Sequence, residues 1–137
     1  MTSSSSSLRF ALLASLALVA CSSGGGSSSS KGSPPVITTL QLPSTFTVSN
    51  GDYTAQGTIA FQAGSAAITT LHEKIPAYNL DSTEAVPSIG NTGMAEIIVG
   101  FVSSATIASG TQVQIDVSLI DANGNESNVE TEQVSVP

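Results

Sequence analysis

The sequence predicts an all-β domain built as a sandwich of two antiparallel sheets, and two observations lead to this fold class. Beyond residue 36, apolar and polar residues alternate with a period of two, and no segment there has the 3.6-residue period of a helix. Turn-forming residues recur between the alternating segments. About seven short strands in roughly one hundred residues are typical of a two-sheet sandwich.

Three segments show the alternation most clearly, over residues 53–63, 95–101 and 111–121. Their predicted inward-facing residues are Tyr53, Ala55, Gly57, Ile59, Phe61 and Ala63; Ala95, Ile97, Val99 and Phe101; and Val113, Ile115, Val117 and Leu119. Less regular strands are expected over 36–42, 46–48, 67–73 and 129–136. In the last of these the apolar phase shifts between Val129 and Val134, which predicts a bulge or a frayed edge.

The segments between the strands contain residues that favour turns. Asn50-Gly51-Asp52 and Ala63-Gly64-Ser65 are two such sites, and residues 121–125 form the third. Asn and Gly adopt positive φ at low cost, so these sites predict antiparallel hairpin connections.

The first twenty residues predict an export signal. Arg9 precedes an apolar run over residues 10–20, which is about half the length needed to cross a bilayer as a helix. We therefore interpret residues 1–20 as a cleaved signal peptide and leave them out of the fold.

The end of this run, Leu18-Val19-Ala20-Cys21, resembles the lipobox of bacterial lipoproteins. The resemblance implies a diacylglycerol on the Cys21 sulfur, cleavage between Ala20 and Cys21, and acylation, for example with palmitate, of the new N-terminus. Two or more acyl chains hold a protein stably in a membrane. Ser22 is not an aspartate, which by resemblance to the enterobacterial sorting pattern implies the outer membrane. The alternative is an ordinary secretory signal in which Cys21 is incidental.

A low-complexity stretch follows the cysteine. Residues 22–33 are Ser and Gly with one Lys, a composition that cannot bury apolar surface and predicts a disordered tether. Such a coil reaches ~20 Å, enough to hold a small domain clear of lipid headgroups. The predicted organisation is a signal peptide (1–20), a lipidated cysteine with its linker (21–35) and one β-sandwich domain (36–137).

Residues 109–127 resemble the end of bacterial immunoglobulin-like and fibronectin type III-like domains. The shared features are Ser109-Gly110 before a long strand and Asp121-Ala122-Asn123-Gly124-Asn125-Glu126-Ser127 after it. Residues 57–61, followed by Gly64 and Ile68, resemble the second and third strands of those domains. The chain has no Trp, no cysteine pair and no Tyr in the penultimate strand, so it departs from antibody-type domains. The resemblance implies an immunoglobulin-like sandwich used for adhesion, spacing or ligand display, and fold alone does not fix function.

The charge distribution argues against two classes of partner. The net charge is -7, and the three basic residues, Arg9, Lys31 and Lys74, form no cluster. Nucleic acids and anionic lipid surfaces are both bound through grouped Lys and Arg. We expect no nucleic-acid partner, and membrane contact only through the lipid anchor.

Three groups of polar residues are candidates for chemistry. Asp121, Asn123 and Asn125 place oxygens at alternate positions, as at the start of a calcium loop, but the rest of such a loop is missing and a hairpin turn explains them equally. We therefore predict no metal site, with these three residues as the candidates to test. His72-Glu73-Lys74 is the densest titratable cluster, but a lone His beside a charged pair near the end of a strand is typical of a solvated strand end, and catalysis would need a positioned nucleophile and an orienting acid. We accordingly predict no catalytic residues, no cofactor and no enzyme activity.

Residues 75–91 form the longest segment without a strand pattern. Long loops on a rigid scaffold often carry function. Tyr78, Asp81 and Glu84 are therefore candidate contacts for a protein or glycan, although a crossover loop between the two sheets with short irregular edge pairing would also explain the segment. The functional expectation is a lipid-anchored envelope protein that displays a non-enzymatic interaction or structural module. The alternative is a glycan- or small-ligand-binding accessory module, with or without calcium.

Overall fold

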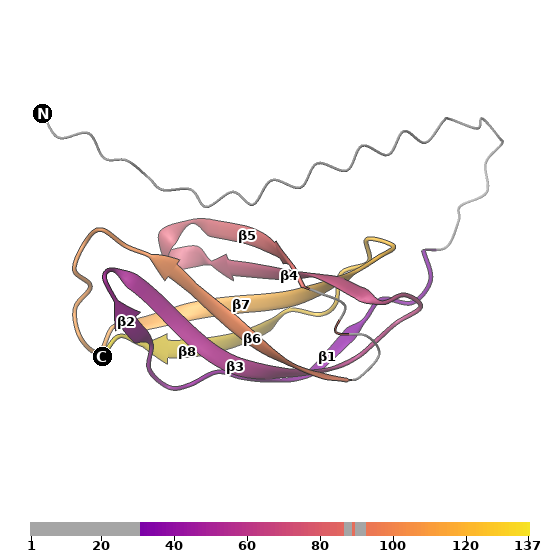
Figure 1. Cartoon of the computed structure of the whole chain (residues 1–137), viewed down its shortest axis with the longest axis horizontal. Helices are drawn as coiled ribbons and strands as arrows, with labels where there is room; N and C mark the ends of the chain where they lie inside the picture. The colour runs from indigo at the N-terminus through magenta and orange to yellow at the C-terminus, as the bar shows by residue number, and fades with distance from the viewer. Residues whose placement is uncertain (1–30, 87–88, 90–92) are drawn as a thin grey trace, which may run out of the picture.

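The computed structural model describes residues 31–86, 89 and 93–137, which contain eight strands and one short 3-10 turn (Figure 1). The elements are β1 (Val36–Gln41), β2 (Thr47–Ser49), β3 (Asp52–Gln62), β4 (Ile68–Ile75), η1 (Pro76–Tyr78), β5 (Leu80–Ala85), β6 (Met94–Val102), β7 (Gln112–Asp121) and β8 (Glu130–Ser135). The predicted signal peptide, its cleavage site at Ala20 and Cys21, and most of the linker lie outside the described residues. Within the described part of the chain, no helix is long and apolar enough to cross a membrane.

The strands form two four-stranded antiparallel sheets. In the first, β1 and β2 pair with one edge of β3, and β6 pairs with the other edge. In the second, the order is β5-β4-β7-β8. The predicted all-β, immunoglobulin-like sandwich of two antiparallel sheets is confirmed, with eight strands where about seven were expected.

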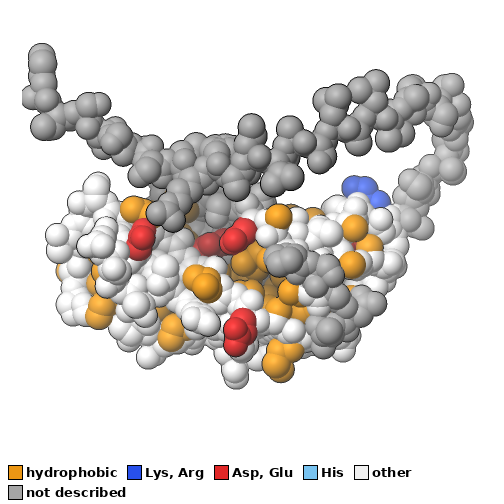
Figure 2. All heavy atoms as spheres, viewed as in Figure 1, with side chains coloured by type: hydrophobic (Ala, Val, Ile, Leu, Met, Phe, Trp, Pro, Cys, Tyr) orange, Lys and Arg blue, Asp and Glu red, His pale blue; other side chains and the backbone are white. Residues whose placement is uncertain are grey.

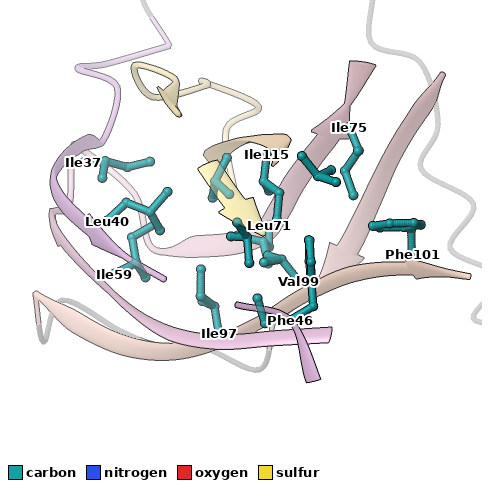
Figure 3. Close-up of a cluster of buried hydrophobic side chains, with 14 of the residues drawn as sticks. Ile37, Leu40, Phe46, Ile59, Leu71, Ile75, Ile97, Val99, Phe101 and Ile115 are labelled. Carbon is teal, nitrogen blue, oxygen red and sulfur yellow. The ribbon is translucent and has the colours of Figure 1, made fainter. Parts of the chain in front are cut away.

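Burial follows the alternation found in the sequence. On β7, Val113, Ile115, Val117 and Leu119 are at most 1% exposed. Tyr53, Ala55, Ile59 and Phe61 are buried on β3, as are Ile97, Val99 and Phe101 on β6. Side chains from the two sheets point toward one another in this core (Figure 3). An apolar face on each sheet thus supplies the main driving force for packing the two layers.

The turn between β2 and β3 shows how local sequence sets the strand register. Asn50 and Gly51 have φ of 52° and 85°, and Ser49 pairs directly with Asp52. Two positive-φ residues between paired strands make the hairpin turn whose twist matches that of the strands. Val129, where the apolar phase shifts, lies just before β8 and outside its paired residues, and its side chain is 58% exposed.

Strand β5 lies in residues 75–91, the segment that shows no strand pattern in the sequence. Leu80–Ala85 pairs with β4 over six residues, in agreement with the alternative of a crossover with short edge pairing. All six residues of β5 are exposed. With neither face buried, an edge strand needs no apolar alternation, and this explains the missing signal.

One side of the sandwich is closed by hydrogen bonds between the sheets. Phe46 N–H donates to the Ser135 carbonyl at 2.9 Å, and Ser135 N–H donates to the Ser44 carbonyl at 2.9 Å. The Asn128 side chain accepts from Ile37 N–H at 2.8 Å and donates to the Ile37 carbonyl at 3.1 Å. Backbone bonds thus join the segment after β1 to β8, and side-chain bonds join β1 to the segment before β8.

Candidate functional site

His72 on β4 lies between two carboxylates. Its Nε2 is 2.7 Å from Asp81 Oδ1 on β5, and its Nδ1 is 2.7 Å from Glu126 Oε1 in the segment that follows β7. Lys74 Nζ lies 3.6 Å from Asp81 Oδ2. The register places His72 opposite Thr83 and Lys74 opposite Asp81, so these side chains share the outer face of their sheet. We call His72, Asp81 and Glu126 the histidine clamp.

The clamp does not have the geometry of a nucleophilic triad. Ser118, opposite His72 on β7, is 3% exposed, and its hydroxyl donates to Glu126 Oε1 at 2.5 Å. A nucleophilic serine must instead be hydrogen-bonded to a histidine acting as its base. Both ring nitrogens of His72 are already held by carboxylates. The arrangement fits a structural tie that links β4, β5 and the segment that follows β7.

The clamp sets a pH dependence of stability. Hydrogen bonds to Asp81 and then Glu126 raise the pKa of His72 above its usual value, against an opposing effect of burial. The hydrogen bond from His72 lowers the pKa of Asp81. Hydrogen bonds from Ser118 and then His72 lower the pKa of Glu126. The histidine contribution is therefore complete below about pH 6.5 and is lost as pH rises through the raised pKa. The carboxylate contribution is lost only at acidic pH, as pH falls through the lowered pKa values.

We expect His72→Gln to destabilise the protein more at pH 5.5 than at pH 8.5. Urea unfolding of the variant and the unmodified chain at both pH values measures this difference. Glu73, which also titrates, is present in both proteins, so its contribution cancels. A loss of stability that is equal at the two pH values would mean that the protonated clamp does not form.

The Asp121 region forms a compact turn. Asp121 Oδ1 accepts from the backbone N–H of Asn123 at 2.9 Å and of Asn125 at 2.8 Å, and Oδ2 accepts from Asn125 Nδ2 at 2.9 Å. Burial raises the pKa of Asp121, but these donors outweigh it and the pKa is lowered. The Asn123 and Asn125 amides also donate to the Lys31 carbonyl, at 3.2 and 2.8 Å. The candidate calcium residues thus use their polar atoms to build the turn and to hold the start of the described chain.

The candidate contact residues Tyr78, Asp81 and Glu84 do not form one surface. The Tyr78 ring stacks on Phe101, with centroids 4.5 Å apart and planes at 22°. Asp81 belongs to the histidine clamp on the outer face. Glu84, opposite Leu71, projects from the other face of β5 toward the space beside β6. Glu84 lines a hollow there.

That hollow is a groove between the edge strands β5 and β6. It comprises two adjoining hollows of about 220 and 310 Å³ that share Glu84 and Ile98. Glu73, Asp52 and Glu96 also line it. On the face of the molecule shown in Figure 2, hydrophobic and acidic side chains lie next to one another. We call the two joined hollows the β5–β6 groove.

Glu73 crosses the groove from β4 to β6. Its Oε1 accepts from the backbone N–H of Gly100 at 2.8 Å. Partial burial raises the pKa of Glu73 to about 7; the Gly100 hydrogen bond opposes this shift, and nearby Glu84 adds to it. The sequence marked Glu73 only as part of a charged cluster, because its partner lies 27 residues away in the other sheet.

The outer face of β6 carries a row of exposed apolar residues that sequence reasoning missed. Met94, Ile98 and Val102 are 65%, 59% and 75% exposed. They occupy the face that an ordinary half-buried strand fills with polar residues. Their four-residue spacing on that face was the available signal.

Comparisons with known proteins identify no family for this chain. No protein-family model matches it, and no curated protein matches it. Among solved structures, it is similar to the PKD domain of an M14-like peptidase from Thermoplasmatales archaeon SCGC AB-540-F20. The identity is 19%, the match covers 77% of this chain and 98% of that chain, and the TM-score is 0.48.

Proposed function

We propose that this protein is a non-enzymatic interaction module, tethered by a lipid on Cys21 to the outer membrane of a bacterial cell. The observation that carries the interaction role is the exposed apolar row of β6 beside the β5–β6 groove. Exposed apolar side chains grouped on one face of an edge strand, beside a groove, are a candidate binding surface. The occupied ring nitrogens of His72 support a role without catalysis.

The position at which the chain enters the domain fits display from a tether. The Lys31 carbonyl is held at the turn after β7, and the turn between β2 and β3 lies at the opposite end of the sandwich (Figure 1). Ser33 N–H donates to Ser65 Oγ at 2.8 Å and fixes the entry further. A domain held at one end leaves its long sides, including the groove, open to a partner.

The anchor is tested by detergent-phase partitioning of the protein expressed in a bacterial host. We expect the unmodified chain to enter the detergent phase and the Cys21→Ser variant to remain in the aqueous phase, since the variant has no sulfur to carry the lipid. Ser22→Ala, a change at the next residue, serves as the matched control and should partition like the unmodified chain. Detergent partitioning of Cys21→Ser would rule out a lipid on this residue.

A further inference from the structure

The two long sides of the sandwich differ in how their edges are covered. Hydrogen bonds join β1 and the neighbouring segment to β8 and Asn128 on one side. On the other side, β5 pairs with β4 and β6 pairs with β3, and β5 and β6 do not pair with each other in the described part of the chain. Glu73 is the side chain that reaches across this side to the β6 backbone.

The backbone of β6 directs alternate residues toward the open side. In an antiparallel ladder, the N–H and C=O of one residue point to the same side, and this side alternates along the strand. Two bonds that flank β6 run toward β3. The Gly93 carbonyl accepts from Phe61 N–H, and Ser103 N–H donates to the Gly51 carbonyl. Gly100 donates in the opposite direction, to Glu73. The N–H and C=O groups of Glu96 and Ile98 therefore face the groove, as a template for another strand.

The charged side chains that line the groove are all acidic. The carboxyl-bearing side chains along it are Asp52, Glu73, Glu84 and Glu96. Of the two lysines in the described residues, Lys74 is held by Asp81 on the outer face, and Lys31 lies at the turn after β7. A second copy of this chain, with its own net charge of -7, would bring like charges together across the same edge. The charge favours a cationic partner.

We propose that the open edge of β6 binds an extended peptide in which apolar residues alternate with Lys or Arg, by addition of a strand to the first sheet. This inference rests on the proposed interaction role and specifies its partner. An added strand would set one row of side chains beside Ile98 and Val102 and the other row toward Glu73 and Glu84. A carbonyl of the peptide takes the place of the Glu73 carboxylate at Gly100 N–H.

The test uses a capped eight-residue peptide of alternating lysine and valine, labelled for fluorescence anisotropy, with the full chain in detergent solution. We expect saturable binding that weakens at least about tenfold in the Ile98→Lys variant, which places a charge in the apolar row. Val129→Lys is the matched control, because it makes the same change in charge at a residue of nearly equal exposure, 58% against 59%. We expect that variant to bind within about twofold of the unmodified chain.

Two further measurements separate strand addition from simple attraction of charge. A lysine–valine peptide methylated at alternate backbone nitrogens keeps its charge but loses strand pairing, and we expect it to bind at least about tenfold more weakly. Ile98→Thr keeps β propensity and net charge, and we expect it to weaken binding severalfold. Should Ile98→Lys fail to fold by circular dichroism, Ile98→Thr and the methylated peptide decide the question.

Several outcomes would overturn the proposal. The first is that the peptide does not bind at millimolar concentration. The second is that Ile98→Lys and Val129→Lys weaken peptide binding equally. The third is that the methylated peptide binds as tightly as the unmethylated peptide. A dimer of the full chain that Ile98→Lys dissociates would show that a second copy occupies the edge instead. Since peptide binding in solution does not require the anchor, failure here leaves the detergent-partitioning result for Cys21 intact.

Discussion

Replacing Leu119 with alanine is expected to lower the free energy of unfolding by about 3–5 kcal/mol, the upper part of the range for buried leucines. Leu119 is fully buried on β7, which lies between β4 and β8, and it pairs with Leu71. Ser127 also holds its backbone: Leu119 N–H donates to Ser127 Oγ at 2.9 Å, and the Leu119 carbonyl accepts from Ser127 N–H at 2.8 Å. Such a rigid site cannot collapse into the cavity, so we expect a large cost. Urea unfolding monitored by circular dichroism measures it.

Val129→Ala is the control for this substitution. Val129 is 58% exposed, and its truncation should change stability by no more than about 0.5 kcal/mol. Single domains are stable by only about 5–15 kcal/mol, so Leu119→Ala should also reduce the yield of folded protein. Equal, small effects at the two positions would show that β7 does not form the centre of the core.

Replacing Gly57 with alanine is expected to cost about 3 kcal/mol, through a clash at the pairing of β1 with β3. A Cβ at Gly57 would lie 2.1 Å from the Gln41 carbonyl oxygen and 2.8 Å from Leu42 Cδ2. Because the first of these atoms belongs to the backbone, the strands themselves would have to separate. In an open strand the same change would stabilise the protein by about 0.5–1 kcal/mol. Thermal and urea unfolding give the sign and the size of the effect.

Gly110→Ala separates this steric effect from backbone strain. Gly110 has a φ of +80°, and a Cβ there would meet nothing within 4 Å. Its substitution should therefore cost only the left-handed backbone penalty of about 1–2 kcal/mol. A Gly57→Ala variant as stable as the unmodified chain would contradict the close approach of β1 to β3.

The elements that could be predicted from sequence are those with one face in the core. On β3, β6 and β7, each inward residue is apolar because it packs against the facing sheet, so the pattern reflects the layer directly. The strand β5 has both faces exposed and lies at an edge, so its six residues carry no such pattern. β5 forms because its backbone pairs with that of β4, and the residues of β5 give no sign of this pairing.

The candidate site was harder to predict, because its contacts depend on register. His72 is 9 residues from Asp81 and 54 from Glu126, and the three meet only through the pairing of β4 with β5 and β7. Tyr78 was a candidate contact by its position in a long segment, and its ring stacks on Phe101. The exposed apolar row that includes Ile98 gives only a weak signal in the sequence, because the alternation in β6 is already explained by the buried residues on its opposite face.

Residue-resolved hydrogen exchange by NMR tests the open edge of β6 most directly. Ile98 N–H faces the groove, whereas Val99 N–H bonds toward β3 within the ladder. We predict that the Ile98 amide exchanges rapidly and that the Val99 amide is protected to nearly the level of the β7 core amides. Addition of the lysine–valine peptide should then slow exchange at Ile98. Equal protection of Ile98 and Val99 in the free protein would mean that this edge is already covered and would contradict the account.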